Sequence, residues 1–323
     1  MTAGNANFNT LATSTLVKYA DKTLVDNIFQ SNALFYLLAG TEEMRKAGGR
    51  GYKELDGGKQ IVEPLLYASN STAGSYDGYD VLDTDPQDGM TNAEFDWKQY
   101  SVSVSVSGKE KRQNTGETAV LNLIEGKIMQ AEMSIIEAMN GDLFTDGTGN
   151  SSKDLTGFVL AVDSAGTYGN IVRSENSWWS AQETAVSGPL TIDAMRTMYN
   201  DCSKGYGKDH PELLITDQDE YEAYEAKLQP DMRYSDNKLG DAGFENLKFK
   251  GSQIVYDEQC NAGVMYYLNL KYTGIRVHKD AKFTVTDEMR PVDQDAFVKQ
   301  ILWMGNVVQS NSARQGKMTG FTD

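Results

Sequence analysis

The chain has 323 residues, of which 24% are charged and 40% hydrophobic, so it is long enough and apolar enough to bury a core. Its 46 Asp and Glu against 30 Lys and Arg give a formal net charge of -16, and this charge repels phosphate backbones and anionic membranes. The composition excludes a chain that is disordered throughout and argues against a general nucleic-acid binder.

The N-terminus, the apolar stretches and the cysteines indicate where the protein is expected to be located. The first ten residues, MTAGNANFNT, contain no basic residue and no apolar run, which argues against a secretory signal. The longest uncharged apolar stretches, such as NALFYLLAG at 32–40, fall short of the roughly 20 residues that a membrane helix needs. Cys202 and Cys260 form no CxxC motif, so we expect two unpaired thiols. We therefore expect a soluble protein of a reducing cytoplasm.

The segment 11–40 is predicted to form short helical pieces separated by polar breaks. Apolar residues recur near helical spacing at Leu16, Tyr19, Leu24 and Ile28. No core lies beside this segment in the sequence. An amphipathic arm of this kind needs a surface to lie on, either the body of its own chain or a neighbouring subunit.

Two strand-like runs follow Gly48. The first, KQIVEPLLY at 59–67, contains Pro64, which cannot donate to a ladder and so indicates an edge strand or a bulge. The second is FDWKQYSVSVSVSG at 95–108. Between them lie about 25 mostly polar residues, which is longer than the loops usual inside compact domains. The pattern predicts a long two-stranded ribbon, and such a ribbon is marginal alone in water.

The alternation inside the second run is its most regular feature. Val102, Val104 and Val106 share one face of the predicted strand, and the intervening serines share the other. An uncharged strand with an open edge invites pairing with another chain. We therefore expect the valine face to meet a partner, and the small serines to let another surface approach closely.

Residues 114–140 are predicted to form the longest helix. Asn114 and Glu117 have the spacing of a capping box, and Asn140-Gly141 supplies a stop. At 1.5 Å per residue, about 25 residues make a rod of ~38 Å, well above the usual helix of about 11 to 12 residues. The apolar stripe lacks a sustained heptad, so a coiled coil is the weaker interpretation.

The second half of the chain is predicted to mix short helices with strands. Thr191 caps a helix over 192–202, and Thr216-Asp217 separates a strand from a helix within 212–228. From Leu247 onward strand patterns dominate. The predicted fold class is α+β.

The sequence contains no catalytic constellation. His210 and His278 lie in no ligand or base motif, so a structural role is favoured for both. Gly108-Lys109 and Gly207-Lys208 lack the rest of a Walker loop. DGTGNSSKDLTG at 146–157 lacks the Gly and Glu of a calcium loop, so a plain turn is favoured over calcium. We predict no catalytic, cofactor-binding or metal-binding residues, and no enzyme.

An arm without a core, a ribbon without a sheet and an oversized helix indicate a subunit that its neighbours complete. In this order the parts resemble the major capsid protein of tailed bacteriophages. The resemblance covers nearly the whole chain and lies in the order and spacing of these stretches: LVDNIFQSNALFYLLAG, WKQYSVSVSVSGKEKRQNTGE, DGTGN, LTGF, LLITDQDEYEAYEAKL, FKGSQIVYDE, VMYYLNLKY and ILWMGNVVQSNSARQGKMTGFT.

By position, the resemblance implies a capsid fold with a long spine helix, a two-stranded extended loop, a peripheral domain and an axial domain. It implies an N-terminal arm over 1–47, the extended loop over 48–113, and the spine helix with the first part of the peripheral domain over 114–189. The axial domain is expected over 190–275, and the return strands of the peripheral domain over 276–323.

The resemblance also implies function and partners. Such chains assemble as pentamers and hexamers into the icosahedral head of the virion, which encloses double-stranded DNA and is built in the host bacterial cytoplasm. The extended loop lies over an adjacent subunit. A separate scaffolding protein, a portal and a decoration protein are expected partners, with no cofactor and no membrane. The residues expected to make contacts between subunits are Pro64, Tyr67, Trp97, Tyr100, Val102, Val104 and Val106.

Two alternatives stay open at this point. An encapsulin-type nanocompartment shares the fold and would hold a cargo enzyme instead of DNA. A β-rich ligand-binding protein or enzyme belongs to another class and would remain a monomer. The acidic balance favours a shell that holds DNA without binding it, because a lining that repels phosphate does not retain the packaged molecule.

Overall fold

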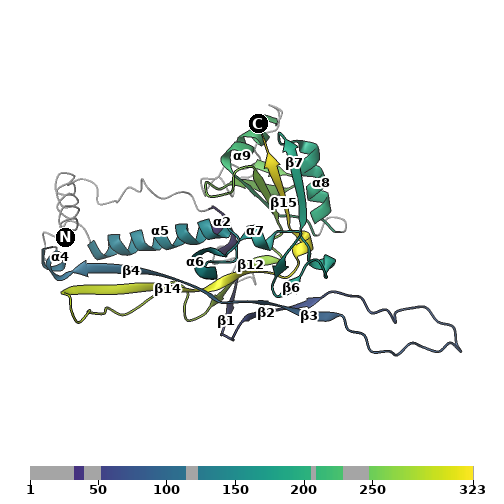
Figure 1. Cartoon of the computed structure of the whole chain (residues 1–323), viewed down its shortest axis with the longest axis horizontal. Coiled ribbons are helices and arrows are strands. Elements are labelled where there is room, and N and C mark those ends of the chain that lie inside the picture. Colours follow the sequence, from purple (N-terminus) through teal and green to yellow (C-terminus); the bar gives the residue numbers. More distant parts are fainter. Residues whose placement is uncertain (1–32, 40–51, 114–122, 205–208, 228–246, 323) are drawn as a thin grey trace. The chain divides into compact units, whose positions relative to one another are not determined.

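The computed structural model describes residues 33–39, 52–113, 123–204, 209–227 and 247–322 (Figure 1). The chain divides into two compact units, which we call unit 1 and unit 2. Unit 1 contains the described residues of Gln99–Ala138 and Asp280–Trp303, and unit 2 those of Ser31–Lys98, Met139–Lys279 and Met304–Asp323.

Unit 1 packs a strand pair against one long helix. Its elements are β4 (Lys98–Ser107), α4 (Gly108–Gln113), α5 (Leu123–Leu143), β13 (Thr284–Val285) and β14 (Ala296–Gln309). β14 pairs with β4 and, antiparallel, with β13. Val104, Ala131 and Ile301 form its buried core, one residue each from β4, α5 and β14. α5 and β14 both continue along the chain into unit 2.

Unit 2 contains a six-stranded sheet of order β7-β15-β11-β8-β10-β9. Its strands are β7 (Gln182–Gly188), β8 (Leu213–Thr216), β9 (Leu247–Phe249), β10 (Ser252–Tyr256), β11 (Val264–Leu268) and β15 (Gly316–Phe321). β8 runs parallel to β10 and antiparallel to β11, and all four of its residues are buried. A central strand covered on both faces is expected to be largely apolar, as LLIT is, and its one polar side chain, Thr216, donates to the Val264 carbonyl.

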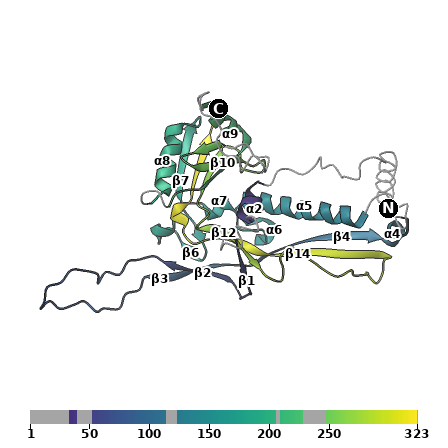
Figure 2. The ribbon, with the colours of Figure 1, turned by 180° about the vertical axis from the view of Figure 1, so that it is seen from behind.

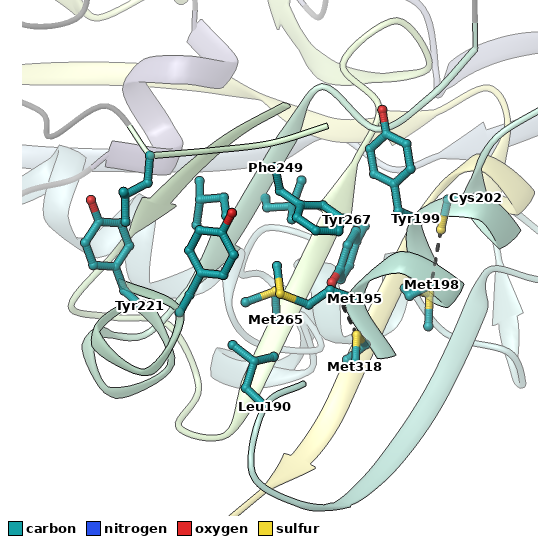
Figure 3. Packing of buried hydrophobic residues seen from close by; sticks show 14 residues of the cluster. Leu190, Met195, Met198, Tyr199, Cys202, Tyr221, Phe249, Met265, Tyr267 and Met318 are labelled. Atoms are coloured by element: carbon teal, nitrogen blue, oxygen red, sulfur yellow. Dashed lines mark hydrogen bonds between the residues drawn. The ribbon is translucent and has the colours of Figure 1, made fainter. Parts of the chain in front are cut away.

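Two helices cover this sheet (Figure 2). α8 (Ile192–Cys202) packs on β7 and β15, and α9 (Gln218–Lys227) packs on β10. Figure 3 shows the core between these elements, in which Met195, Met265 and Tyr267 are fully buried. Aromatic and methionine side chains supply most of this packing, and they fill an irregular space well.

Both helix starts follow the predicted caps. The Thr191 hydroxyl accepts a hydrogen bond from the Ala194 N–H, so it satisfies one free donor at the start of α8. The Asp217 carboxylate accepts one from the Glu220 N–H at the start of α9. The predicted helix over 192–202 and the strand-helix pair within 212–228 are confirmed.

A second sheet lies partly in unit 2. β12 (Thr273–His278) pairs parallel with β1 (Tyr52–Leu55) and antiparallel with β14. The ribbon of β2 (Ile61–Leu66) and β3 (Met90–Phe95) forms a two-stranded sheet of its own, with the strands side by side (Figures 1 and 2). Short pieces complete the unit: α6 (Gly149–Ser152), α7 (Phe158–Ala161), β5 (Thr167–Tyr168), β6 (Ile171–Val172), η1 (Ser177–Trp179) and η2 (Ser312–Arg314).

The described part of the predicted arm, α2 (Ala33–Ala39), lies on its own chain. The Asp257 carboxylate accepts a hydrogen bond from the Leu34 N–H at 3.1 Å, and the Asn140 side chain accepts one from the Phe35 N–H at 3.1 Å. Asn140 also donates to both oxygens of Asp257. Because Asn140 and Asp257 are fully buried, this network must be satisfied as a whole. The rest of segment 11–40 is outside the described residues.

Three predicted boundaries differ from the structure. The long helix is described over Leu123–Leu143, whereas its predicted start at Asn114 is outside the described residues. The predicted second ribbon strand is two strands, β3 and β4, with different partners. β15 lies in the sheet built from residues 182–268, although we predicted 276–323 as return strands of a different domain.

Two sequence-based expectations concern cysteines and membranes. Cys202 and Cys260 are both unpaired, as predicted, and both are buried. Among the helices in the described part of the chain, none is both long enough and apolar enough to span a membrane.

Candidate assembly surface

The β2–β3 ribbon has one buried face and one exposed face. Its register pairs Ile61 with Phe95, and both side chains are buried on the inner face with Leu65 and Ala93. On the outer face, Leu66 pairs with Met90, and these two side chains are 76% and 78% exposed. Along these strands buried and exposed residues alternate, and the exposed face is partly apolar. Such a face is suited to packing against another protein.

The inner face is held by a partly buried ion pair and a close backbone contact. Glu63 on β2 pairs with Arg276 on β12, and their side chains are only 14% and 16% exposed. The Glu94 N–H donates to the Gly169 carbonyl at 3.1 Å. Gly169 has φ +59°, and a Cβ there would lie 3.0 Å from the Ala93 Cβ. Only glycine tolerates both the positive φ and this close approach, so the ribbon can pack here only because residue 169 is glycine.

The break between β3 and β4 is held by hydrogen bonds to distant parts of unit 2. The Asn306 side chain, 1% exposed, donates to the Asp96 carbonyl at 2.8 Å. The Trp97 indole donates to the Gly58 carbonyl at 2.9 Å and packs edge-on against His278 at 5.7 Å. The strand is therefore interrupted at Asp96, where a side chain from a distant part of the chain satisfies the backbone carbonyl.

Beyond the paired residues, the ribbon continues into an exposed segment of residues 68–88, which we call the excursion. It carries five aspartates and no Lys or Arg: Asp77, Asp80, Asp83, Asp85 and Asp88. Its tip is an ordered turn, in which the Asp80 N–H donates to the Asp77 carbonyl at 2.8 Å. Within that turn Tyr79 is fully exposed.

The excursion also exposes apolar side chains that we did not predict as contacts. Tyr76 and Leu82 are 68% and 56% exposed, and Val81 is 99% exposed. A signal was available in the sequence, because YDVL at 79–82 interrupts a segment made mostly of small and polar residues. Large apolar residues in a polar loop that has no core nearby indicate a contact surface.

The seven predicted contact residues fall in two different units. Pro64, Tyr67 and Trp97 belong to unit 2, where Pro64 is exposed and the Tyr67 ring stacks on Trp178 at 5.5 Å. Tyr100 belongs to unit 1, where its ring packs edge-on against Trp303 at 5.9 Å. For these four residues, contact with another subunit stays a prediction.

The predicted role of the valine face needs correction. Val104 and Val106 are 5% and 4% exposed, and Val104 packs with Ala131 and Ile301 of its own chain. Val102, which is half-buried, packs against the same cluster. The partner that this face needs is α5 and β14 of the same subunit, so the valines are core residues.

The serine that ends β4 has a role that we did not predict. The Ser107 hydroxyl accepts from the Glu110 N–H at 3.2 Å, and the Glu110 carboxylate accepts from the Ser107 N–H at 3.0 Å. These reciprocal bonds form a capping box that begins α4, and the spacing SGKE is its sequence signal. Burial opposes ionisation of Glu110, but the Ser107 N–H and the Lys127 ammonium keep its pKa below the ordinary value.

His210 and the segment 146–157, which were considered as functional sites, make structural contacts instead. His210 stacks on Tyr199 at 5.9 Å. At 146–157, the Asp146 carboxylate accepts from the Thr148 N–H at 3.0 Å, an Asx turn, and this bond lowers the Asp146 pKa. The described residues hold no group of three or more His, Cys, Asp or Glu placed to bind a metal ion.

No protein-family model matches the chain. No curated protein matches it in sequence. Among solved structures, the chain is similar to the cyanophage A-1(L) capsid asymmetric unit, with TM-score 0.71 and 17% identity over 94% of this chain and 97% of that chain. It is also similar to the capsid of a native GTA particle, with TM-score 0.65 and 10% identity over 94% of each chain.

A third similar structure is the holo-SrpI encapsulin complex from Synechococcus elongatus PCC 7942. Its TM-score is 0.58, at 8% identity over 96% of this chain and 95% of that chain. The three matches extend over nearly the whole of both chains in each case. They confirm the predicted α+β capsid fold.

Proposed function

We propose that this chain, whose fold is that of tailed-phage capsid proteins, is a major capsid protein. It assembles as pentamers and hexamers into the icosahedral head that encloses double-stranded DNA in a virion. The observation that carries this proposal is the full-length likeness to a cyanophage capsid chain, with TM-score 0.71 over 97% of that chain. The likeness extends over 94% of this chain, so it covers most of the fold.

The exposed surface of the subunit supports assembly. The ribbon and its excursion carry large apolar side chains that nothing in the described part of their own chain covers, among them Leu66, Tyr79, Val81 and Met90. Folded monomers rarely expose such residues together, and a larger exposed apolar surface marks a site of association. In an assembled shell, neighbouring subunits remove these side chains from water.

The domain assignment follows from the same likeness. We assign the extended loop to residues 48–113, with the β2–β3 ribbon and excursion as its projecting part, and the spine helix to α5. The axial domain corresponds to the six-stranded sheet with α8 and α9. The C-terminal strand β15 joins that sheet, so its boundary lies outside the range 190–275.

The negative net charge of the subunit supports a shell that encloses DNA without binding it strongly. The net charge of -16 makes the average field of the subunit repulsive to phosphate. Assembly with a separate scaffolding protein, a portal and a decoration protein is part of this proposal. The isolated subunit is expected to show no strong DNA binding even at low salt.

Sedimentation and negative-stain microscopy of the expressed chain test the proposal. We expect large closed particles, either from the chain alone or on co-expression with a scaffolding protein from the same genome. A monodisperse monomer under both conditions, with a defined small-molecule ligand, would contradict assembly and favour the ligand-binding or enzyme alternative.

An encapsulin-type nanocompartment is the second candidate, and the likeness to the SrpI encapsulin complex supports it. The contents of native particles distinguish the two functions. Double-stranded DNA inside the shell supports the phage head, whereas a folded cargo enzyme and no DNA support the nanocompartment.

A further inference from the structure

A groove of about 260 Å³ opens in unit 2 beside the end of β2, where the excursion begins. Its lining includes Leu65, Tyr67, Trp178, Lys204, Asn311 and Arg314. Tyr67 and Trp178 form one wall, with their rings stacked at 5.5 Å and an angle of 21° between them. The groove therefore combines a flat aromatic wall with two cationic side chains.

The two cations have no carboxylate partner within the described part of the chain. Neither Lys204 nor Arg314 forms an ion pair there. Asp209 lies close enough to feel the charge of Arg314, but its two oxygens are bonded to Lys271 at 2.8 Å and to the Tyr272 hydroxyl at 3.1 Å. The groove thus offers positive charge beside an aromatic surface, which suits an acidic and aromatic ligand.

The excursion has this chemistry. Tyr79 stands between Gly78 and Asp80 in the ordered turn at its tip, and Asp77 and Asp83 lie within four residues of it. No Lys or Arg occurs between Gln60 and Trp97 to neutralise these aspartates. The tip therefore presents an aromatic ring surrounded by negative charge, on a turn that is already ordered.

We propose that the groove beside the end of β2 receives the excursion tip of a second copy of this chain. The Tyr79 ring lies against the Trp178 and Tyr67 wall, and aspartates of the tip pair with Lys204 and Arg314. This inference rests on the proposed function, because it requires that copies assemble. It adds the receiving surface and the anchoring side chain of one contact between subunits.

The occupant is a second copy because the chain's own tip is elsewhere. Tyr79 is 105% exposed, so it does not occupy the groove of its own subunit. Within the described part of the chain, the tip therefore does not fill the groove of its own subunit, which is the condition for a head-to-tail contact, and such contacts close into a ring where the rotation between copies allows it. Trp, Tyr and Arg are the residue types that most often dominate such contacts.

Photo-crosslinking within assembled particles tests this contact. Tyr79→p-benzoylphenylalanine keeps an aromatic ring at the tip and reacts with neighbouring C–H bonds on irradiation. Particles assembled from an equal mixture of isotopically heavy and light chains show by mass spectrometry whether a crosslink joins two copies. We expect heavy-light crosslinks between position 79 and the peptides that contain Trp178 or Arg314. The same photoreactive residue in place of Val292, an exposed residue of unit 1, is the control and should not label those peptides.

Charge reversal gives a second readout. Arg314→Glu should lower the yield of this crosslink about tenfold, the loss expected when one charge-assisted contact is removed. Lys153→Glu makes the same charge change at an exposed position outside the groove and should leave the yield unchanged. Arg314→Lys keeps the charge and should retain most of the crosslink. Thermal melting of each variant shows whether the subunit itself stays folded.

The outcomes separate this inference from the proposed function. Particles that form normally but crosslink position 79 to other peptides, or to a second protein, overturn the groove assignment and leave the capsid function standing. A chain that never assembles overturns both. Crosslinks to the groove peptides that Arg314→Glu does not weaken overturn the pairing of Arg314 with the tip.

Discussion

Val104→Asp tests the assignment of the valine face. The sequence alone predicts that this variant stays folded and fails to assemble, because the face is taken as a contact between subunits. In the structure Val104 is 5% exposed and packs with Ala131 and Ile301 in the core of unit 1. The structure therefore predicts that the subunit itself is destabilised.

The size of the effect follows from burial. Loss of a buried valine costs about 1.5 to 2 kcal/mol of transfer free energy, and a buried carboxylate without a dedicated partner adds several more unless it takes up a proton. We expect about 3 to 5 kcal/mol in total, a large fraction of the roughly 5 to 15 kcal/mol that stabilise a typical domain. With a urea m value of about 2 kcal/mol/M, the midpoint falls by roughly 2 M.

Urea unfolding with hydrogen exchange at the β4 amides measures this effect. Ser103→Asp adds the same charge to the exposed face of the same strand, so it should change stability by no more than about 0.5 kcal/mol. The reasoning is refuted if Val104→Asp unfolds at the wild-type urea concentration, keeps its β4 amides protected and loses only assembly. That result would restore the valine face as an interface.

Three further predictions concern unit 2. Arg276→Met should destabilise it by about 1 to 3 kcal/mol, because Glu63 is left partly buried without its cation, and calorimetry should show that adding Glu63→Gln recovers part of the loss. Burial raises the Asp163 pKa, but the Ala165 N–H and Lys317 outweigh it and hold the folded-state pKa below the unfolded value of about 3.9. The stabilisation by the ionised Asp163 is present above the unfolded-state pKa and is lost as the pH falls through the folded-state pKa. Asp163→Asn should therefore flatten the decline of the melting temperature below about pH 4. An unchanged decline would exclude the Asp163–Lys317 pair as its cause. Burial raises the pKa of Cys202 to about 12 and also raises that of Cys260, so a thiol reagent at pH 8 should label neither in native protein and both in urea; rapid native labelling would contradict their burial.

Local patterns were sufficient to predict the second half of the chain. The start of α8 follows from Thr191 and the apolar spacing after it, and β8 follows from the short run LLIT. In both cases the signal and the structure lie within a few residues of each other. The order of these elements was also enough to identify the fold by resemblance.

The pairing of the ribbon could not be predicted, because long-range contacts decide it. The alternation from 95 to 108 looks like one continuous strand, yet the strand is interrupted at Asp96, where the side chain of Asn306, over 200 residues away, donates to its carbonyl. Whether Val104 faces a neighbour or its own core depends on the positions of α5 and β14, which no local pattern gives. The groove could not be predicted from local patterns either, because its walls come from β2, η1 and η2, which lie far apart in the sequence.

Cryo-electron microscopy of particles purified after expression of this chain tests the central claim most directly. The account predicts closed icosahedral shells whose pentamers and hexamers consist of this chain, with the β2–β3 ribbon of each subunit covered by a neighbour. A preparation that contains only monomers, or shells in which the ribbon and its excursion remain uncovered, would contradict it.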